Sequence, residues 1–265
     1  KKAAHQGAEV ICLPELYSSH YFCQSEDVEN FSIAEPLGDV SFTAFSALAK
    51  ELGVVIIVPF FEKRMSGIYH NSAYIIDTDG SQAGLYRKMH IPDDPHFYEK
   101  FYFTPGDLGF QSIGTKKGNI GTLICWDQWY PEAARLTALK GAEILFYPTA
   151  IGWHPAEKAQ YGENQYGAWM NVMKGHAVAN GIFVAAANRI GLEKYISDTD
   201  GIEFWGKSFI CGPQGELLAL ASHDKEEILM AEVDLALQEN VRQNWPFFRD
   251  RRIDAFGELT KRALD

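Results

Sequence analysis

An internal repeat constrains the fold of this chain more than any other feature of its sequence. Three segments of the first half return in the same order roughly 130 residues later. They are a Gly-Ala-Glu segment with an apolar strand and a proline (7–14 and 141–148), a helical pattern followed by a glycine and a strand (41–58 and 164–186), and a hairpin pattern (72–80 and 207–215). Chance recurrence is the alternative interpretation, because glycine commonly follows a helix. The shared order favours two related halves.

Each half therefore contains a strand, a helix, a second strand and a hairpin. Two mixed sheets, each covered by helices on one side and packed face to face, would accommodate these elements. We predict an α/β fold: a four-layer αββα sandwich of two mixed sheets with a pseudo-two-fold internal repeat. The 265 residues, 46% of them hydrophobic, suffice for one large core. We therefore expect a single domain over residues 1–265.

The repeat also predicts sequence upstream of the first residue. In the second half, the Gly-Ala-Glu strand follows a helix, and that helix follows a strand ending near Cys125. Residues 1–6 correspond only to the last turns of the matching helix in the first half. We therefore expect an N-terminal strand and part of the first helix to precede Lys1. Without them, a strand of the first sheet would leave unpaired backbone groups.

Cys125 is the residue that points most directly to function. It ends the apolar run 118–125, which is typical of a buried strand, and Pro131 opens a helical pattern soon afterwards. A thiol at such a strand-to-helix turn lies near backbone N–H groups, which lower a thiol pKa and stabilise an oxyanion. A buried structural cysteine is the alternative, because free cysteine is among the most buried residue types.

Two charged residues also follow predicted strands. Glu15 comes after the apolar run 10–13 and a proline, and Lys88 comes after the strand-like stretch 84–87. Taken alone, each has the composition of a solvated surface position. Together with Cys125 they supply a base, a cation and a nucleophile at strand ends, where open α/β sheets place their sites.

At these residues the chain resembles the nitrilase superfamily of carbon–nitrogen hydrolases, whose catalytic set is Glu–Lys–Cys. The segments that carry the resemblance are 13–16 (Leu-Pro-Glu-Leu), 86–90 (Tyr-Arg-Lys-Met-His) and 123–127 (Leu-Ile-Cys-Trp-Asp). Segment 98–107 is similar to the part of the family that bears a second active-site glutamate, here Glu99. The resemblance extends from residue 7 almost to the C-terminus and implies the same sandwich fold.

Hydrolysis of an amide or ureide needs a nucleophile, a base, oxyanion stabilisation and an acid for the leaving amine. We predict that Cys125 is the nucleophile. Glu15 is expected to take the thiol proton, pass it to departing ammonia and then activate water. Lys88 is expected to stay protonated and to hold the oxyanion together with the Trp126 N–H. Glu99 is expected to position the substrate nitrogen or Lys88.

The remaining reactive residue types indicate no cofactor and no metal. The cysteines at 12, 23, 125 and 211 and the eight histidines lack the spacing of a zinc site. His90 and His96 are candidate proton shuttles, although paired histidines in a proline-rich loop more often order the loop. A reduced, cytoplasmic protein is the simplest interpretation of this cysteine pattern.

Composition also restricts the partners. The net charge is −11 and the only basic cluster is 249–252, which argues against nucleic acid as a partner. No apolar run approaches ~20 residues, so we expect no membrane span. The resemblance implies a homo-oligomer, a dimer or higher, that acts on a small-molecule ureide.

A narrower resemblance concerns the substrate. Segments 21–24, 150–153 and 248–252 resemble those of particular family members. These members hydrolyse N-carbamoylputrescine to putrescine, carbon dioxide and ammonia in polyamine biosynthesis. An ammonium-tailed substrate is bound by carboxylates and aromatic faces, whereas an N-carbamoyl amino acid needs an arginine. The candidate pocket loops hold residues that suit an ammonium tail: Tyr21, Phe103, Trp126, Trp153, Asp93, Asp94, Glu157 and Glu163.

Two other functions stay open at this point. Arg189 is available for a substrate carboxylate, so the same Glu–Lys–Cys set would also serve N-carbamoyl-β-alanine or an ω-amide. A non-catalytic assembly protein with a nitrilase-like fold is a different class. Such a protein is expected to have lost a member of the catalytic set, yet Glu15, Lys88 and Cys125 are all present.

Overall fold

Two large sheets form the centre of the molecule in the computed structural model, which describes residues 1–195 and 200–264. The first sheet has the order β1-β2-β3-β4, with strands β1 (Val10–Cys12), β2 (Val55–Met65), β3 (Ile68–Ile76) and β4 (Gln82–Arg87). The second has the order β13-β12-β9-β7-β6-β5, with strands β5 (Ser112–Thr115), β6 (Gly118–Thr122), β7 (Ile144–Thr149), β9 (Phe183–Asn188), β12 (Phe209–Cys211) and β13 (Leu217–Leu220).

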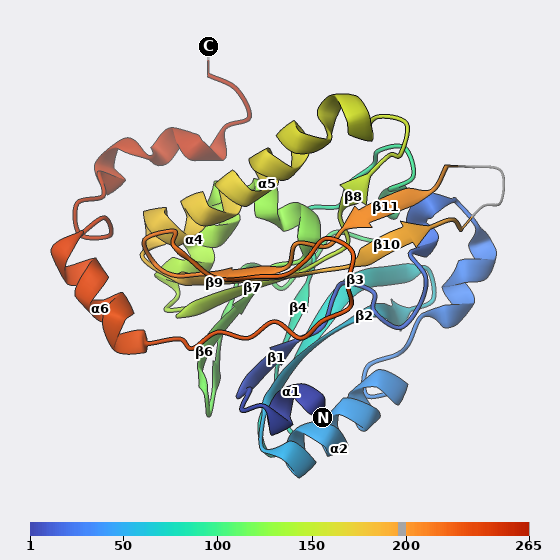
Figure 1. Ribbon diagram of the computed structural model, residues 1–265, viewed down its shortest axis with the longest axis horizontal. Coiled ribbons are helices and arrows are strands. Elements are labelled where there is room, and N and C mark those ends of the chain that lie inside the picture. The colour runs from blue at the N-terminus through green and yellow to red at the C-terminus, as the bar shows by residue number, and fades with distance from the viewer. Residues whose placement is uncertain (196–199, 265) are drawn as a thin grey trace.

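Helices cover the outer faces of both sheets. Helix α2 (Val40–Leu52) lies below the first sheet in Figure 1, and helices α4 (Pro131–Leu139) and α5 (Lys158–Asn180) lie above the second. The predicted four-layer αββα sandwich is confirmed. The other helical segments are α1 (Lys2–His5), η1 (Phe22–Gln24), η2 (Val28–Ile33), α3 (Glu99–Tyr102), η3 (Cys125–Trp129), α6 (Leu235–Asn244), η4 (Ile253–Ala255) and η5 (Gly257–Thr260).

Alternating side chains of β2 supply two different layers of the core. Val55 and Ile57 belong to the apolar cluster that also contains residues of the second sheet. Ile56 and Val58 point to the other side and pack in the cluster that contains Ala49 of α2. Because successive side chains of a strand face opposite sides, a continuous apolar run is what a strand buried on both faces requires.

The two halves use their repeated elements in the same way. Strand β1 pairs in parallel with β2, and β2 pairs antiparallel with β3; likewise β7 pairs in parallel with β9, and β9 pairs antiparallel with β12. Strand β6 adds a parallel neighbour to β7, whereas β1 is the edge strand of its sheet. The expected strand upstream of Lys1 concerns sequence outside the described residues and stays a prediction.

Helix α5 begins earlier than its sequence pattern predicts. The pattern indicated a helix over 164–180, but α5 starts at Lys158, which places Glu163 on a helix rather than in a loop. Gly162, normally a weak helix former, is buried against Trp153, whose Nε1 donates to the Gly162 carbonyl over 3.1 Å. This tertiary contact explains why the helix continues through a segment without an apolar period.

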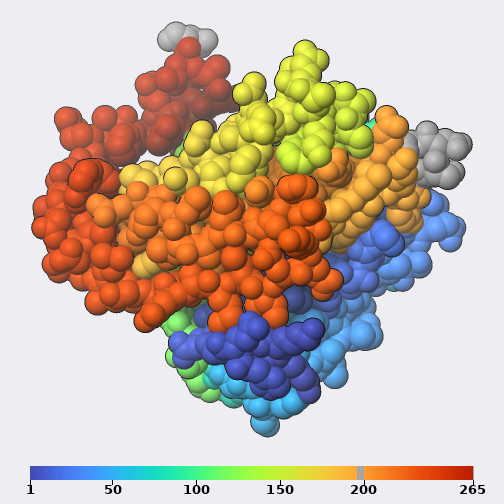
Figure 2. Space-filling view, viewed as in Figure 1, coloured from blue at the N-terminus to red at the C-terminus, as the bar shows by residue number. Residues whose placement is uncertain are grey.

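A small third sheet, which the sequence did not predict, closes one end of the sandwich. It has the order β10-β11-β8, with strands β8 (Gly152–Trp153), β10 (Ile190–Glu193) and β11 (Ile202–Trp205). Gly152 allows β8 to lie close to β11, because a Cβ at this position would lie 2.4 Å from the Glu203 carbonyl oxygen. Helix α6 packs against the body of the molecule through buried Gln238 and Val241, whereas the end of the chain, dark red in Figure 2, stands out from it.

Candidate active site

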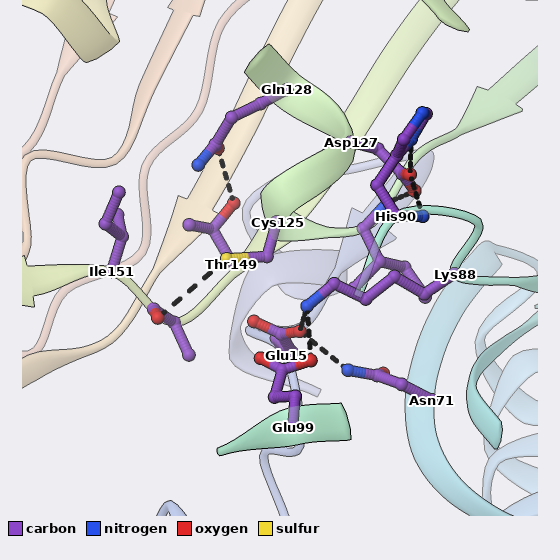
Figure 3. Close-up of polar contacts among 12 residues, drawn as sticks. Glu15, Asn71, Lys88, His90, Glu99, Cys125, Asp127, Gln128, Thr149 and Ile151 are labelled. Atoms are coloured by element: carbon purple, nitrogen blue, oxygen red, sulfur yellow. Dashed lines mark hydrogen bonds and ion pairs between the residues drawn. The ribbon is translucent and has the colours of Figure 1, made fainter. Parts of the chain in front are cut away.

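Four predicted catalytic residues meet where strands of the two sheets end. Glu15 follows β1, Lys88 follows β4, Glu99 begins α3, and Cys125 begins η3 just beyond β6. All four are buried, with exposed fractions between 0% and 4%. In Figure 3 the Lys88 ammonium lies next to both carboxylates and close to the turn that carries Cys125. The sandwich therefore brings together residues from four separate parts of the chain.

The lysine is shared between the two glutamates. Lys88 Nζ lies 2.8 Å from Glu15 Oε1 and 2.6 Å from Glu99 Oε2. Tyr21 donates its hydroxyl to the other Glu99 oxygen over 2.7 Å, and Asn71 Nδ2 donates to Glu15 Oε1 over 2.7 Å. An ammonium between two buried carboxylates is the arrangement that keeps three charges in a low-dielectric interior.

Burial and mutual attraction set the protonation of this cluster. Burial alone would lower the pKa of Lys88, but Glu15 and Glu99 together outweigh it and hold that pKa well above its ordinary value. Burial raises the pKa of Glu99 to about 7, although Lys88 works against this shift. Lys88 is therefore held in its protonated form, and Glu99 binds a proton more tightly than an exposed glutamate does.

Cys125 lies on the tight turn that the sequence predicted, with a φ of 42°, which is unusual for a residue other than glycine. Its Sγ lies 3.8 Å from the Ala150 carbonyl oxygen. The expected low thiol pKa is wrong. Burial and then the charge of Glu15 raise the pKa of Cys125 well above its ordinary value, although Lys88 lowers it. The resting thiol is protonated, so its reaction requires a base.

Asp127 holds the turn of Cys125 in place, and the sequence did not single it out. Its carboxylate accepts from the Ile124 N–H over 3.0 Å and from the Tyr86 hydroxyl over 2.7 Å. Both the backbone N–H of His90 (3.0 Å) and its ring Nδ1 (2.7 Å) contact the same carboxylate. The His90 ring stacks on Tyr130 at 3.7 Å, so this histidine orders its loop, as the more common interpretation proposed.

Arg189 has a structural task that the sequence did not reveal. Its guanidinium donates to the backbone oxygens of Glu15 (3.1 Å) and Ser19 (2.7 Å), and it pairs with Glu193 at 2.6 Å. These contacts occupy the guanidinium at the loop that carries Glu15. These contacts argue against the hypothesis that Arg189 is available for a substrate carboxylate.

The predicted substrate-binding residues lie at different depths. Tyr21 and Phe103 are buried, Trp126 and Trp153 are partly exposed, and Asp94, Glu157 and Glu163 are exposed. Trp153 and Glu163 line one surface hollow of about 380 Å³, where the Lys158 ammonium lies 4.5 Å from the Trp153 ring. Of this set, Tyr21 has a side-chain hydrogen bond to Glu99, and the Phe103 backbone N–H donates to the Glu99 backbone oxygen.

Residues 1–195 and 200–264 contain no group of three or more histidine, cysteine or acidic side chains placed to hold a metal ion. Among the same residues, no helix combines the length and apolar character that crossing a membrane requires.

The αββα sandwich, with a glutamate, a lysine and a cysteine at its strand ends, defines a hydrolase acting on carbon–nitrogen bonds. The family model for carbon-nitrogen hydrolases matches residues 1–243. The chain belongs to this family, within the nitrilase superfamily.

Individual relatives are similar over nearly the whole chain. N-carbamoylputrescine amidase of Solanum tuberosum is 50% identical over 97% of this chain and 86% of that protein. Citrullinase of Francisella tularensis is 41% identical over 98% of this chain and 90% of that protein. The crystal structure of a carbon-nitrogen hydrolase from Helicobacter pylori superposes with a TM-score of 0.95 at 52% identity, over 99% of this chain and 91% of that one.

Proposed function

We propose that the protein hydrolyses N-carbamoylputrescine to putrescine, carbon dioxide and ammonia, in polyamine biosynthesis. The observation that carries this proposal is the buried Lys88 held between Glu15 and Glu99 beside a protonated Cys125. The similarity of about half of the residues to the Solanum tuberosum amidase supports the choice of substrate.

The first half of the proposed reaction forms a carbamoyl-enzyme. Glu15 takes the Cys125 proton as the sulfur attacks the ureide carbon, and the Lys88 ammonium and the Trp126 N–H hold the oxyanion. When the oxyanion collapses, the bond from carbon to the terminal nitrogen breaks. Glu15 delivers its proton to that nitrogen, which leaves as ammonia.

The second half releases the amine. Glu15 takes a proton from water, whose oxygen attacks the carbonyl carbon, and the proton passes to the departing sulfur of Cys125. The product is the carbamic acid of putrescine, which transfers its proton to nitrogen as it loses carbon dioxide and so leaves the free amine. Glu99 is held by Tyr21 and Lys88, and it positions the Lys88 ammonium and the substrate nitrogen in both halves of the reaction.

The ammonium tail of N-carbamoylputrescine distinguishes it from ureides that carry a carboxylate, such as N-carbamoyl-β-alanine. Because Arg189 is occupied by backbone oxygens and by Glu193, it is not free for the carboxylate of N-carbamoyl-β-alanine. An ammonium tail calls for a carboxylate and for aromatic faces, which we expect Tyr21, Phe103, Trp126 and Trp153 to supply. We propose that one of Asp94, Glu157 and Glu163 meets the ammonium.

A cytoplasmic homo-oligomer completes the proposal. All four cysteines are free thiols, which fits a reducing compartment. The C-terminal segment exposes large apolar side chains, including Trp245 (55%), Ile253 (73%) and Leu259 (65%), and an interface between copies would cover them. Light scattering after gel filtration tests this assembly, and a monomer at working concentrations contradicts it.

Ammonia release from a panel of carbamoyl compounds tests the substrate. We expect kcat/KM for N-carbamoylputrescine to exceed that for N-carbamoyl-β-alanine by roughly 10- to 150-fold, the range of one charge-assisted contact. Citrulline belongs in the panel because it joins a ureide to a charged amino-acid group. A preference for either acid-bearing compound would remove the polyamine assignment and leave the hydrolase intact.

A further inference from the structure

Asn71 contacts the proposed base from a neighbouring strand. It lies on β3 and is fully buried, and its Nδ2 donates to Glu15 Oε1 over 2.7 Å. Lys88 Nζ donates to the same oxygen over 2.8 Å, as the dashed lines in Figure 3 indicate. Among the described residues, no group donates to the other carboxylate oxygen, Glu15 Oε2. Glu15 Oε1 thus accepts two hydrogen bonds, and Oε2 is available to take a proton.

We propose that Asn71 is a positioning residue that, with Lys88, occupies Glu15 Oε1 and so leaves Oε2 to take the proton of the Cys125 thiol. The inference rests on the proposed role of Glu15 as the base. The orientation of the Asn71 amide follows from its partner, because the reversed amide would set two acceptor oxygens against each other.

Asparagine suits this position because its amide is neutral. A second cation on Glu15 would stabilise the carboxylate further and weaken it as a base. The amide orients the carboxylate without adding charge. The backbone carbonyl of Asn71 also accepts from the Lys88 N–H over 2.8 Å. The same residue of β3 therefore fixes both the base and the start of the segment that carries the cation.

Other ionisable groups surround Glu15, and none of them differs between the wild type and an Asn71 variant. A change in the pH profile of Asn71→Leu, which adds no ionisable group, therefore reports on the amide. The groups that face Glu15 from the elements around it are Lys88, Glu99, Cys125, Tyr21, Cys23 and Arg189.

Alkylation of Cys125 by iodoacetamide tests the proposal without assuming a substrate. The rate is followed by peptide mass spectrometry from about pH 5 to 9 for the wild type, Asn71→Leu and Asn71→Asp. Asn71→Leu should slow alkylation about 10- to 100-fold near neutral pH and move the rise of the rate to higher pH, because the carboxylate loses a donor. Asn71→Asp should move the rise further, because a second carboxylate opposes ionisation of Glu15.

Asn180→Leu is the matched control. Asn180 is also buried, and its Nδ2 donates over 2.8 Å to the His176 backbone oxygen. Within the described chain, the Oδ1 atoms of both Asn71 and Asn180 have no hydrogen-bond partner. A purely structural role for Asn71 predicts an unchanged pH profile, with any lost activity following the folded fraction measured by circular dichroism. The proposal is overturned by a wild-type profile in Asn71→Leu or by an equal shift in Asn180→Leu.

A second variant covers failure to fold. If Asn71→Leu is unfolded, Asn71→Asp, which has nearly the same shape, decides alone, and a wild-type profile in it overturns the proposal. The proposed function fails separately. A wild type that releases no ammonia from any ureide, but whose alkylation profile shifts in the Asn71 variants, loses the substrate assignment and keeps the role of Asn71.

Discussion

Arg189 donates a hydrogen bond from Nε to the backbone oxygen of Glu15 over 3.1 Å, although 174 positions separate the two residues. Arg189 follows β9 in the second half of the repeat, whereas Glu15 follows β1 in the first. Leu16, which adopts a φ of 48°, also offers its carbonyl oxygen to the same guanidinium. The loop that carries the base is therefore shaped by the other half of the molecule.

Arg189→Lys should lower kcat about tenfold or more with little change in the fold. An ammonium cannot reach several backbone oxygens in the fixed geometry of a guanidinium, so the loop of Glu15 would lose its support. Steady-state ammonia release measures the effect. Arg252→Lys is the control, because Arg252 is exposed and pairs with Asp254 on the surface. Equal activity in both variants would contradict the role given to Arg189.

Lys88→Arg should fail almost as badly as Lys88→Ala. A planar guanidinium does not place a compact charge where the ammonium lies, 2.8 Å from Glu15 and 2.6 Å from Glu99. We expect kcat to fall about 100-fold or more, the typical effect of removing one oxyanion donor. If the arginine variant kept more than about a tenth of the wild-type rate, less than ~1.4 kcal/mol would be at stake and Lys88 would be a general charge.

Glu99→Gln should gain stability relative to the wild type as the pH rises. The folded pKa of Glu99 is raised from its ordinary 4.5 to about 7, first by burial. The protonated acid therefore favours the folded state fully below about pH 4.5, and this contribution is lost as the pH rises through about 7. The neutral amide does not titrate.

The free energy of unfolding, measured by denaturant titration at several pH values, checks this prediction. The difference between Glu99→Gln and the wild type should grow on the order of 1 to 3 kcal/mol between pH 5 and 7. Turnover should fall in the same variant. Tyr21 and Lys88 each donate to one oxygen of Glu99, and the amide of glutamine offers only one acceptor oxygen. A difference in stability that does not depend on pH would show that Glu99 is ionised throughout.

One carboxylate should govern the preference for the ammonium tail. Among Asp94→Asn, Glu157→Gln and Glu163→Gln, one variant should raise KM for N-carbamoylputrescine by roughly 10- to 150-fold and leave N-carbamoyl-β-alanine unaffected. Glu258→Gln is the control, since Glu258 is exposed and pairs with Lys261. If all four variants keep the wild-type ratio of kcat/KM values, none of the three carboxylates binds the tail.

The layers of the fold were predictable because each repeated segment carries a clear local pattern. Val55 to Val58 alternate between two apolar layers, and such a run requires burial on both faces. The third sheet was not predictable. Its strands are short, and β8 consists of Gly152 and Trp153, so pairing rather than periodicity defines it.

The central charges of the site were predictable from their places after strands, and their supports were not. Cys125 ends an apolar run, and Glu15 and Lys88 follow strand-like stretches, which is a local signal. Asp127 and Arg189 act through contacts with residues that are distant in sequence, and nothing local marks those contacts. The one signal available for the role of Asn71 was a polar residue shortly before the apolar part of its strand. The raised pKa of Cys125 depends on burial and on Glu15, which only the folded structure brings together.

Mass spectrometry of the enzyme quenched during turnover of N-carbamoylputrescine tests the central claim most directly. We predict that the peptide containing Cys125 carries the aminobutyl-carbamoyl group, and that the Cys125→Ala variant folds, forms no adduct and releases no ammonia. An adduct on another residue, or substantial ammonia release by Cys125→Ala, would contradict Cys125 as the nucleophile.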